Sequence, residues 1–208
     1  TEQISYVSCH DDMCLVDRLK ASIASLTDKN IPEAIRTAEL LRIDQLAQTC
    51  VFTSQGVPFI LAGEEMLRDK KGVHNCYNSP DSINQFTWTN LQKYPQAFAY
   101  YKSLIQLRKN HPAFRLSTGE KVRQHLEFLP CQQTCLVGFQ LKNLKGIDAW
   151  KNIIVIYNFN KEAKKMQIPE GNYTMACCNG IINEEGLGFV SGQEVEVDGQ
   201  SALILYQK

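Results

Sequence analysis

The sequence predicts an α/β fold followed by an all-β one. Helical periodicity alternates with apolar, strand-like runs up to about residue 115, and short alternating runs separated by Gly, Asn and Asp fill the rest. Hydrophobic residues make up 44% of the 208 residues and charged residues 21%, which excludes a disordered chain or a coiled coil as a description of the whole. We therefore expect two domains, residues 1–115 and 116–208.

The first part reads as strands alternating with helices. Residues 4–9 form a β-prone run, and residues 13–25 and 32–53 are expected to be helices. Residues 57–63 are a continuous apolar run, typical of a strand buried on both faces, and residues 94–110 form a third helix. Two βα units are too few to cover a parallel sheet, so we expect the last two strands and helices of a (β/α)₈ TIM barrel whose earlier strands lie upstream.

The second part is expected to be an antiparallel β-sandwich of roughly ninety residues. Its strands are predicted where apolar and polar residues alternate, at residues 126–128, 136–139, 153–157, 173–175, 195–197 and 202–206.

The charge balance argues against two classes of partner. Lysine and arginine number 22, as do aspartate and glutamate, so the formal net charge of zero gives no electrostatic basis for binding nucleic acid or a membrane surface. The longest apolar stretch is also far too short to span a bilayer, which needs about 18 residues. We expect a partner that is recognised by hydrogen bonds and shape. The compartment stays open between the cytoplasm and the periplasm or exterior of a bacterium.

The eight cysteines show no repeated metal-binding spacing, so we expect mostly free thiols, with Cys131 and Cys135 as the best candidates for a disulfide. A metal site built from His10, Asp11, Asp12, His74 and Cys76 matches no zinc pattern, and we expect neither a metal nor another cofactor.

Chemically active groups follow both apolar runs. His10, Asp11 and Asp12 come directly after the first, and polar groups at the carboxyl ends of barrel strands form the active sites of that fold. The alternative is that an aspartate caps the next helix and His10 is an ordinary surface residue. Glu64 comes after the second run, where the alternative is a solvated loop.

The loop at residues 75–88 is dense in amides, one carboxylate and aromatic rings. Sugars bind to planar polar groups through their hydroxyls and to aromatic faces through their C–H surfaces, so this composition fits a carbohydrate site. A surface turn rich in Asn and Pro is the alternative.

Together, these segments resemble the α-amylase family of glycoside hydrolases, and most closely its type I pullulanases. Residues 6–11 (YVSCHD) are similar to the family's seventh-strand motif, and residues 55–65 (QGVPFILAGEE) to its eighth strand. Residues 67–88 resemble the loop of type I pullulanases, and residues 107–115 (LRKNHPAFR) the end of the eighth helix. The antiparallel remainder resembles the family's C-terminal β-sandwich.

By this resemblance, Asp11 stabilises the oxocarbenium-like transition state and His10 hydrogen-bonds the sugar at the cleavage point. The resemblance also implies that five residues line the substrate subsites: Glu64, Tyr77, Asn78, Asp81 and Asn84. One departure is that the family usually has Asn where this chain has Asp12. A second carboxylate beside Asp11 raises one of the two pKa values through like-charge repulsion.

The implied function is that of the carboxyl-terminal part of an enzyme that cleaves α-1,6 branch linkages in pullulan, starch or glycogen with retention of configuration. In this family the nucleophile and the general acid lie on the fourth and fifth strands, which would precede Ile4, so we expect the chain alone to be inactive. Its bare barrel edge is expected to favour self-association. Two alternatives remain: a carbohydrate-binding module that uses Trp150 or Tyr157, and a fragment of an isoamylase or branching enzyme.

Overall fold

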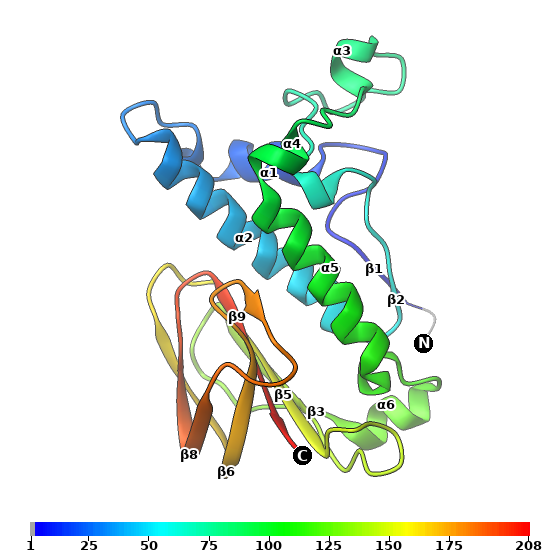
Figure 1. Ribbon diagram of the computed structural model, residues 1–208, viewed down its shortest axis with the longest axis vertical. Coiled ribbons are helices and arrows are strands. Elements are labelled where there is room, and N and C mark those ends of the chain that lie inside the picture. The colour runs from blue at the N-terminus through cyan, green and yellow to red at the C-terminus, as the bar shows by residue number, and fades with distance from the viewer. Residues whose placement is uncertain (1–2) are drawn as a thin grey trace.

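The computed structural model describes residues 3–208 and combines helices with antiparallel sheet (Figure 1). Two long helices lie over one face of a seven-stranded antiparallel sheet, and a two-stranded parallel sheet lies on their far side near the amino terminus. The prediction of helices in the first part and an antiparallel sheet in the second is confirmed, except that a helix at Gly119–His125 falls within the part expected to be all-β.

The parallel sheet is much shorter than predicted. Strands β1 (Ile4–Ser5) and β2 (Val57–Pro58) pair in parallel with Ile4 opposite Val57. The expectation that the second apolar run is buried on both faces is wrong, because Val57 is 55% exposed and Phe59 42%. Within residues 3–208 each of these strands has a single neighbour, so one side of the pair faces solvent.

The turn into β2 depends on a glycine. Gly56 has a φ of +93°, and a Cβ at this position would collide with the Gln3 carbonyl oxygen. A side chain at residue 56 would therefore be strained and would also displace the chain that enters β1.

Three long helical segments were predicted, and two match closely. Helix α2 (Glu33–Thr53) begins directly after Pro32, and α5 (Pro95–Asn110) begins with a proline at its first position. The predicted helix at residues 13–25 breaks into α1 (Leu15–Ser22) and the 3₁₀ turn η1 (Ala24–Leu26). Five further short helical segments connect the longer elements: η2 (Glu64–Met66), α3 (Asp81–Asn84), α4 (Asn90–Lys93), η3 (Pro112–Arg115) and α6 (Gly119–His125).

The seven-stranded sheet has the order β3-β4-β5-β9-β6-β7, with β8 paired to β6. All of its pairings are antiparallel, as predicted for this half. The strands are β3 (Leu126–Phe128), β4 (Leu136–Leu141), β5 (Asn152–Asn158), β6 (Lys164–Cys178), β7 (Ile181–Ile182), β8 (Phe189–Val197) and β9 (Ser201–Gln207).

Strand β5 is buried on both faces, which shows how the sheet folds over itself. Ile153 and Val155 belong to the core under the helices, whereas Ile154 and Ile156 belong to a second core formed with β6 and β8. The two layers are parts of one hydrogen-bonded sheet rather than two separate sheets. The long strand β6 carries the chain between them: its residues 164–174 pair with β8, and residues 174–177 pair with β9.

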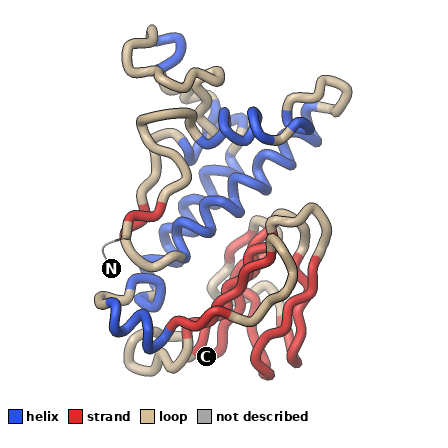
Figure 2. The backbone as a smooth tube through the Cα atoms, turned by 180° about the vertical axis from the view of Figure 1, so that it is seen from behind, coloured by secondary structure: helices blue, strands red, loops and turns tan. Residues whose placement is uncertain are grey.

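The larger core joins the helices to the sheet. Leu46 and Phe52 of α2 and Leu104 of α5 are buried against Ile204 of β9 and its neighbours. Figure 2 shows the same arrangement from behind, with the helical layer on one side of the strands. Apolar burial of this kind contributes about 25 cal/mol per Å², so the contact between helices and sheet is a main source of stability.

No helix in the described part of the chain is long and apolar enough to cross a membrane. All eight cysteines are unpaired, Cys131 and Cys135 included, so the structure does not contain the disulfide considered for these two residues.

Candidate functional site

The loop after β1 is fixed by Asp12. This residue has a φ of +63°, a left-handed conformation that aspartate tolerates better than most residues. Its carboxylate lies 2.7 Å from His74 Nδ1 and accepts a hydrogen bond of 2.5 Å from Arg18. Hydrogen bonds from the Met13 backbone N–H, Arg18 and His74 lower the pKa of Asp12 to about 2, so the rise expected from like-charge repulsion does not occur at this residue. The contact with His74 joins this loop to the asparagine-rich loop.

His10 and Asp11 are both directed into solvent. Their side chains are 82% and 80% exposed, and His10 Nε2 lies 3.3 Å from an Asp11 carboxylate oxygen. Because Asp12 holds the turn that follows, the imidazole and carboxylate stand side by side at the end of β1 instead of pointing to opposite faces as adjacent strand residues do.

Arg68 organises the second loop. Its guanidinium donates to the carbonyl oxygens of Ala62, at 3.0 Å, and Asn84, and its Cζ lies 4.2 Å from the centroid of the Phe86 ring. A planar guanidinium can make both contacts at once, which a lysine cannot. Arg68 thereby joins the segment after β2 to the end of the asparagine-rich loop.

The asparagine-rich loop forms an arm that projects from the molecule at the end opposite the seven-stranded sheet (Figures 1 and 2). Asn84 has a structural part in it, since its amide donates to the carbonyl oxygens of Cys76, at 2.7 Å, and Ser79, at 3.0 Å. Tyr77, by contrast, is 82% exposed, and Asn78 and Asp81 are also exposed. These three residues are free to meet a ligand.

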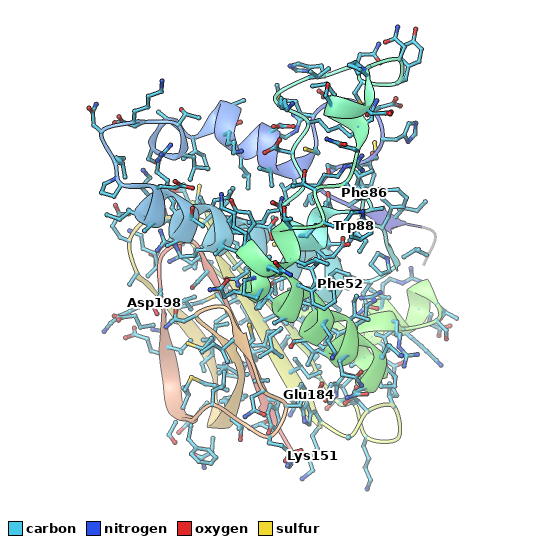
Figure 3. The ribbon with its side chains drawn as sticks, turned by 45° about the horizontal axis from the view of Figure 1, so that its top comes forward. Phe52, Phe86, Trp88, Lys151, Glu184 and Asp198 are labelled. Carbon is cyan, nitrogen blue, oxygen red and sulfur yellow. The ribbon has the colours of Figure 1, made fainter. Side chains whose placement is uncertain are left out.

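Two aromatic rings continue the arm toward α4. Phe86 and Trp88 lie with ring centroids 5.4 Å apart, and Trp88 is 66% exposed (Figure 3). An exposed indole can stack on the C–H face of a sugar ring. The sequence pattern included Trp88 in the loop but did not single it out.

Glu64 lies apart from the exposed groups. It is 3% exposed, and its carboxylate accepts hydrogen bonds from Ser8 Oγ and from Gln48 Nε2, the latter at 3.0 Å. Burial raises the pKa of Glu64 to about 7, although these two hydrogen bonds act in the opposite direction. The structure therefore places Glu64 beneath the surface, where it connects the segment after β2 to β1 and α2.

A second buried network was missed by sequence reasoning. Asp17 of α1 is 4% exposed and accepts hydrogen bonds from Cys14 Sγ, at 3.0 Å, and from the Lys70 backbone N–H, at 2.6 Å. Lys70 Nζ in turn lies 2.7 Å from Cys76 Sγ. The only sequence signal was an aspartate beside Leu15 and Val16 on the buried face of a helix.

The aromatic residues considered for a binding module lie in the core. Trp150 is 3% exposed and stacks between His111 and Tyr206, with ring centroids 3.5 and 4.0 Å away. Tyr157 is 6% exposed, and its hydroxyl contacts Thr53. Neither ring offers a face to a sugar. The binding-module alternative is therefore wrong in assigning sugar contacts to Trp150 and Tyr157.

The candidate site consists of two exposed groups whose loops are joined by one contact. His10 and Asp11 form one, Tyr77, Asn78 and Asp81 form the other, and the contact between Asp12 and His74 connects their loops. Within residues 3–208 the structure gathers no three side chains suited to hold a metal ion. The inventory of carboxylate, imidazole, amide and aromatic groups suits hydrogen bonding to hydroxyls and stacking on a ring.

Comparison with known proteins identifies the relatives of this chain. The family described as "Pullulanase, all-beta domain" matches residues 122–180. A pullulanase of Bacillus subtilis is 32% identical over 207 residues, which cover 99% of this chain and 27% of that protein. The structure of a pullulanase from Bacillus acidopullulyticus superposes with a TM-score of 0.88 at 45% identity and covers 98% of this chain. The chain is related to the pullulanases along its whole length.

The resemblance to pullulanases stated from the sequence is thereby confirmed. The structure of type I pullulanase from Bacillus subtilis, complexed with maltose, has a TM-score of 0.85 and 32% identity over 98% of this chain. An isoamylase of Flavobacterium matches as well, at 35% identity over 38% of the chain. This chain spans about a quarter of the length of the pullulanases it matches, 27% of the Bacillus subtilis protein and 24% of the Bacillus acidopullulyticus chain.

Proposed function

We propose that this chain is the carboxyl-terminal part of a pullulanase-like glycoside hydrolase that cleaves α-1,6 branch linkages in α-glucans with retention of configuration. The observation that carries the proposal is the match to pullulanases over 98–99% of the chain, with 45% identity to one of them. In this proposal residues 1–115 are the end of a (β/α)₈ barrel, with β1 and β2 as its seventh and eighth strands, and residues 116–208 are the C-terminal β domain.

Asp11 and His10 have distinct parts in the proposed reaction. The Asp11 carboxylate stabilises the positive charge that develops on the sugar ring at the transition state, more strongly than it interacts with the ground state. His10 donates a hydrogen bond to a hydroxyl of the same sugar. Their side-by-side position and exposure at the end of β1 support these roles.

The substrate is proposed to lie along the projecting arm. Tyr77, Asn78 and Asp81 supply exposed contacts there, and the related Bacillus subtilis pullulanase is complexed with maltose, a ligand of the same α-glucan class. Asn84 and Glu64 take part indirectly, because Asn84 holds the arm and Glu64 lies beneath β1 and β2.

We further propose that the chain alone does not hydrolyse glucans. A retaining enzyme needs two carboxyl groups about 5–5.5 Å apart on either side of the bond. Near Asp11, the Asp12 carboxylate is engaged by Arg18 and His74, and Glu64 is buried. The purified 208-residue chain should therefore release no reducing sugar from pullulan, and measurable turnover would show that this part of the proposal is wrong.

The exposed apolar side of the helical part is proposed to be an interface. Ile60, Phe98 and Ile105 line a groove of about 510 Å³ between α5 and the segment after β2, and Phe98 is 46% exposed. An uncovered surface of this kind favours self-association of the chain. Size-exclusion chromatography at increasing concentration should show oligomers, and a strict monomer would contradict this expectation.

An isoamylase or a branching enzyme would use the same chemistry as a pullulanase. It would differ in which glycosidic bond it cleaves and in whether it transfers the cleaved chain. The isoamylase match covers only 38% of the chain, whereas the match to the Bacillus subtilis pullulanase covers 99% of it. The longer match favours pullulan over other branched glucans as the first substrate to test.

A further inference from the structure

Lys70 and Cys76 make an unusual contact at the base of the projecting arm. Lys70 is 7% exposed and Cys76 is 4% exposed, and Lys70 Nζ lies 2.7 Å from Cys76 Sγ. Nitrogen and sulfur atoms that merely share a hydrogen bond lie farther apart than this, because sulfur is a large atom. Lys70 Nζ and Cys76 Sγ are therefore close enough for a single atom to bridge them.

The side chain of Lys70 is paired with the thiol of Cys76 and not with a carboxylate of the described residues. Among residues 3–208 the one polar contact that the structure gives Lys70 Nζ is the thiol, and no carboxylate is in contact with it. The nearby Asp17 carboxylate is engaged by Cys14 Sγ and by the Lys70 backbone N–H.

We propose that Lys70 and Cys76 are a redox modification site, at which a peroxide converts the contact into a covalent N–O–S crosslink. The net reaction consumes the thiol, the amine and two molecules of hydrogen peroxide and yields the crosslink and three molecules of water. The S–H bond and one N–H bond break, an S–O and an N–O bond form, and one peroxide oxygen remains as the bridge. Sulfur and nitrogen each lose two electrons, which reduce the two peroxides. Dithiol reductants reverse the reaction and restore thiol and amine, with release of water.

The crosslink would close a loop of the arm covalently. Residues 70–76 lead directly into Tyr77 and Asn78, and the Cys76 carbonyl oxygen already accepts a hydrogen bond from Asn84. A bond between residues 70 and 76 would hold this loop in the conformation that presents the exposed arm. The inference rests on the contact itself and does not depend on the proposed glucan chemistry.

Mass spectrometry of the purified chain tests the proposal directly. After treatment with hydrogen peroxide and blocking of free thiols, trypsin should leave residues 69–71 joined to residues 72–93, with a mass equal to the two peptides plus one oxygen and minus two hydrogens. Dithiothreitol should separate them. The exposed Cys131 shows in the same digest that oxidation took place.

Variants separate the crosslink from general oxidation. Lys70→Arg and Cys76→Ser should abolish the joined species, whereas Lys71→Arg, which changes the exposed neighbouring lysine, should leave it intact. The proposal is overturned if Cys131 is oxidised in the unmodified sequence while Lys70 is recovered as a free amine, whether Cys76 is then a thiol or a sulfinic or sulfonic acid. Because this outcome is read in the unmodified chain, it does not depend on the folding of a variant.

Discussion

Asp12 Oδ1 lies 2.7 Å from His74 Nδ1 and joins two loops that are 62 residues apart in the sequence. Arg18 holds the other carboxylate oxygen of Asp12. The turn that presents His10 and Asp11 is therefore tied on one side to α1 and on the other to the projecting arm. An asparagine at this position would also accept the left-handed backbone but would carry no charge for Arg18 and His74.

The first prediction concerns the titration of Asp12. Its carboxyl carbon, followed by NMR, should titrate with a midpoint of about 2, because three hydrogen bonds stabilise the charged form. Since the pKa in the folded state lies below the ordinary 3.8, the stabilisation is present above that value and is lost as the pH falls toward 2. In Arg18→Gln the midpoint should rise. A midpoint of 3.8 in the unmodified chain would contradict the described contacts.

The second prediction concerns Glu64, whose pKa moves the other way. Burial raises it from 4.5 to about 7, so the folded state binds a proton that the unfolded state has lost. The contribution of Glu64 to stability should be greatest below pH 4.5 and should fall as the pH rises to 7, by about 3 kcal/mol at most, since each pKa unit corresponds to about 1.4 kcal/mol. Other carboxyl groups that face Glu64 are those of Asp44 and Glu65, and Asp44 is also held above its ordinary pKa by burial.

Glu64→Gln should remove this part of the pH dependence. The Gln48 amide can turn to accept from the new amide, because its Oε1 has no hydrogen-bond partner among the described residues. Urea unfolding at pH 5 and pH 8 should show a smaller loss of stability in Glu64→Gln than in the unmodified chain, with the exposed Glu185→Gln as control. An equal loss in all three proteins would contradict the assignment to Glu64.

The third prediction concerns Arg108, which holds the end of α2. Its guanidinium donates to the carbonyl oxygens of Phe52, Ser54 and Gly56 at 2.6–2.7 Å, and burial lowers its pKa to about 10. A lysine cannot reach three carbonyls from one fork, so Arg108→Lys should lower the free energy of unfolding by about 2 kcal/mol. The exposed Arg123→Lys should have little effect. Equal stability of the two variants in urea would show that the contacts contribute little.

The fourth prediction separates the core from the glucan surface. Trp150→Phe should lower stability, because it disrupts the stack with His111 and Tyr206, but should leave maltotetraose binding unchanged. Asp81→Ala should weaken that binding and leave stability unchanged, since this carboxylate is exposed. Calorimetric titration and thermal unfolding of both variants measure the two quantities. The reverse pattern would favour a binding module centred on the β half.

The helices and the sheet strands were predictable because local periodicity determines them. Helix α2 lies within one residue of its expected bounds, since its proline and its apolar spacing mark it. Strand β6 was predicted only in part, because Pro169 and Gly171 are typical of a turn. The chain instead accommodates these residues in a bulge between Gln167 and Gly171, and the strand continues beyond it. The short β1 and β2 were overestimated, because an apolar run does not reveal how many strands lie beside it.

The sequence predicted which loops form the candidate site but not the contacts that its side chains make. Sequence alone indicated where polar groups follow strands, but it could not show that Asp12 binds His74 or that Glu64 turns inward to Ser8. These contacts join residues that are more than 50 positions apart, and only the packing of α1 and α2 against the segment after β2 brings them together. The Lys70 and Cys76 contact joins residues only six positions apart and depends on the local fold of the arm.

The most direct test of the central claim replaces the matching segment of the Bacillus subtilis pullulanase with this chain and measures reducing-sugar release from pullulan. The hybrid should debranch pullulan, and Asp11→Asn should lower its rate by roughly 100-fold or more, as loss of a group that stabilises transition-state charge does. Asp198→Asn, which changes an exposed aspartate on the β half far from the arm, should leave the rate unchanged (Figure 3). A folded hybrid without activity, or an Asp11→Asn hybrid as active as its parent, would contradict the account.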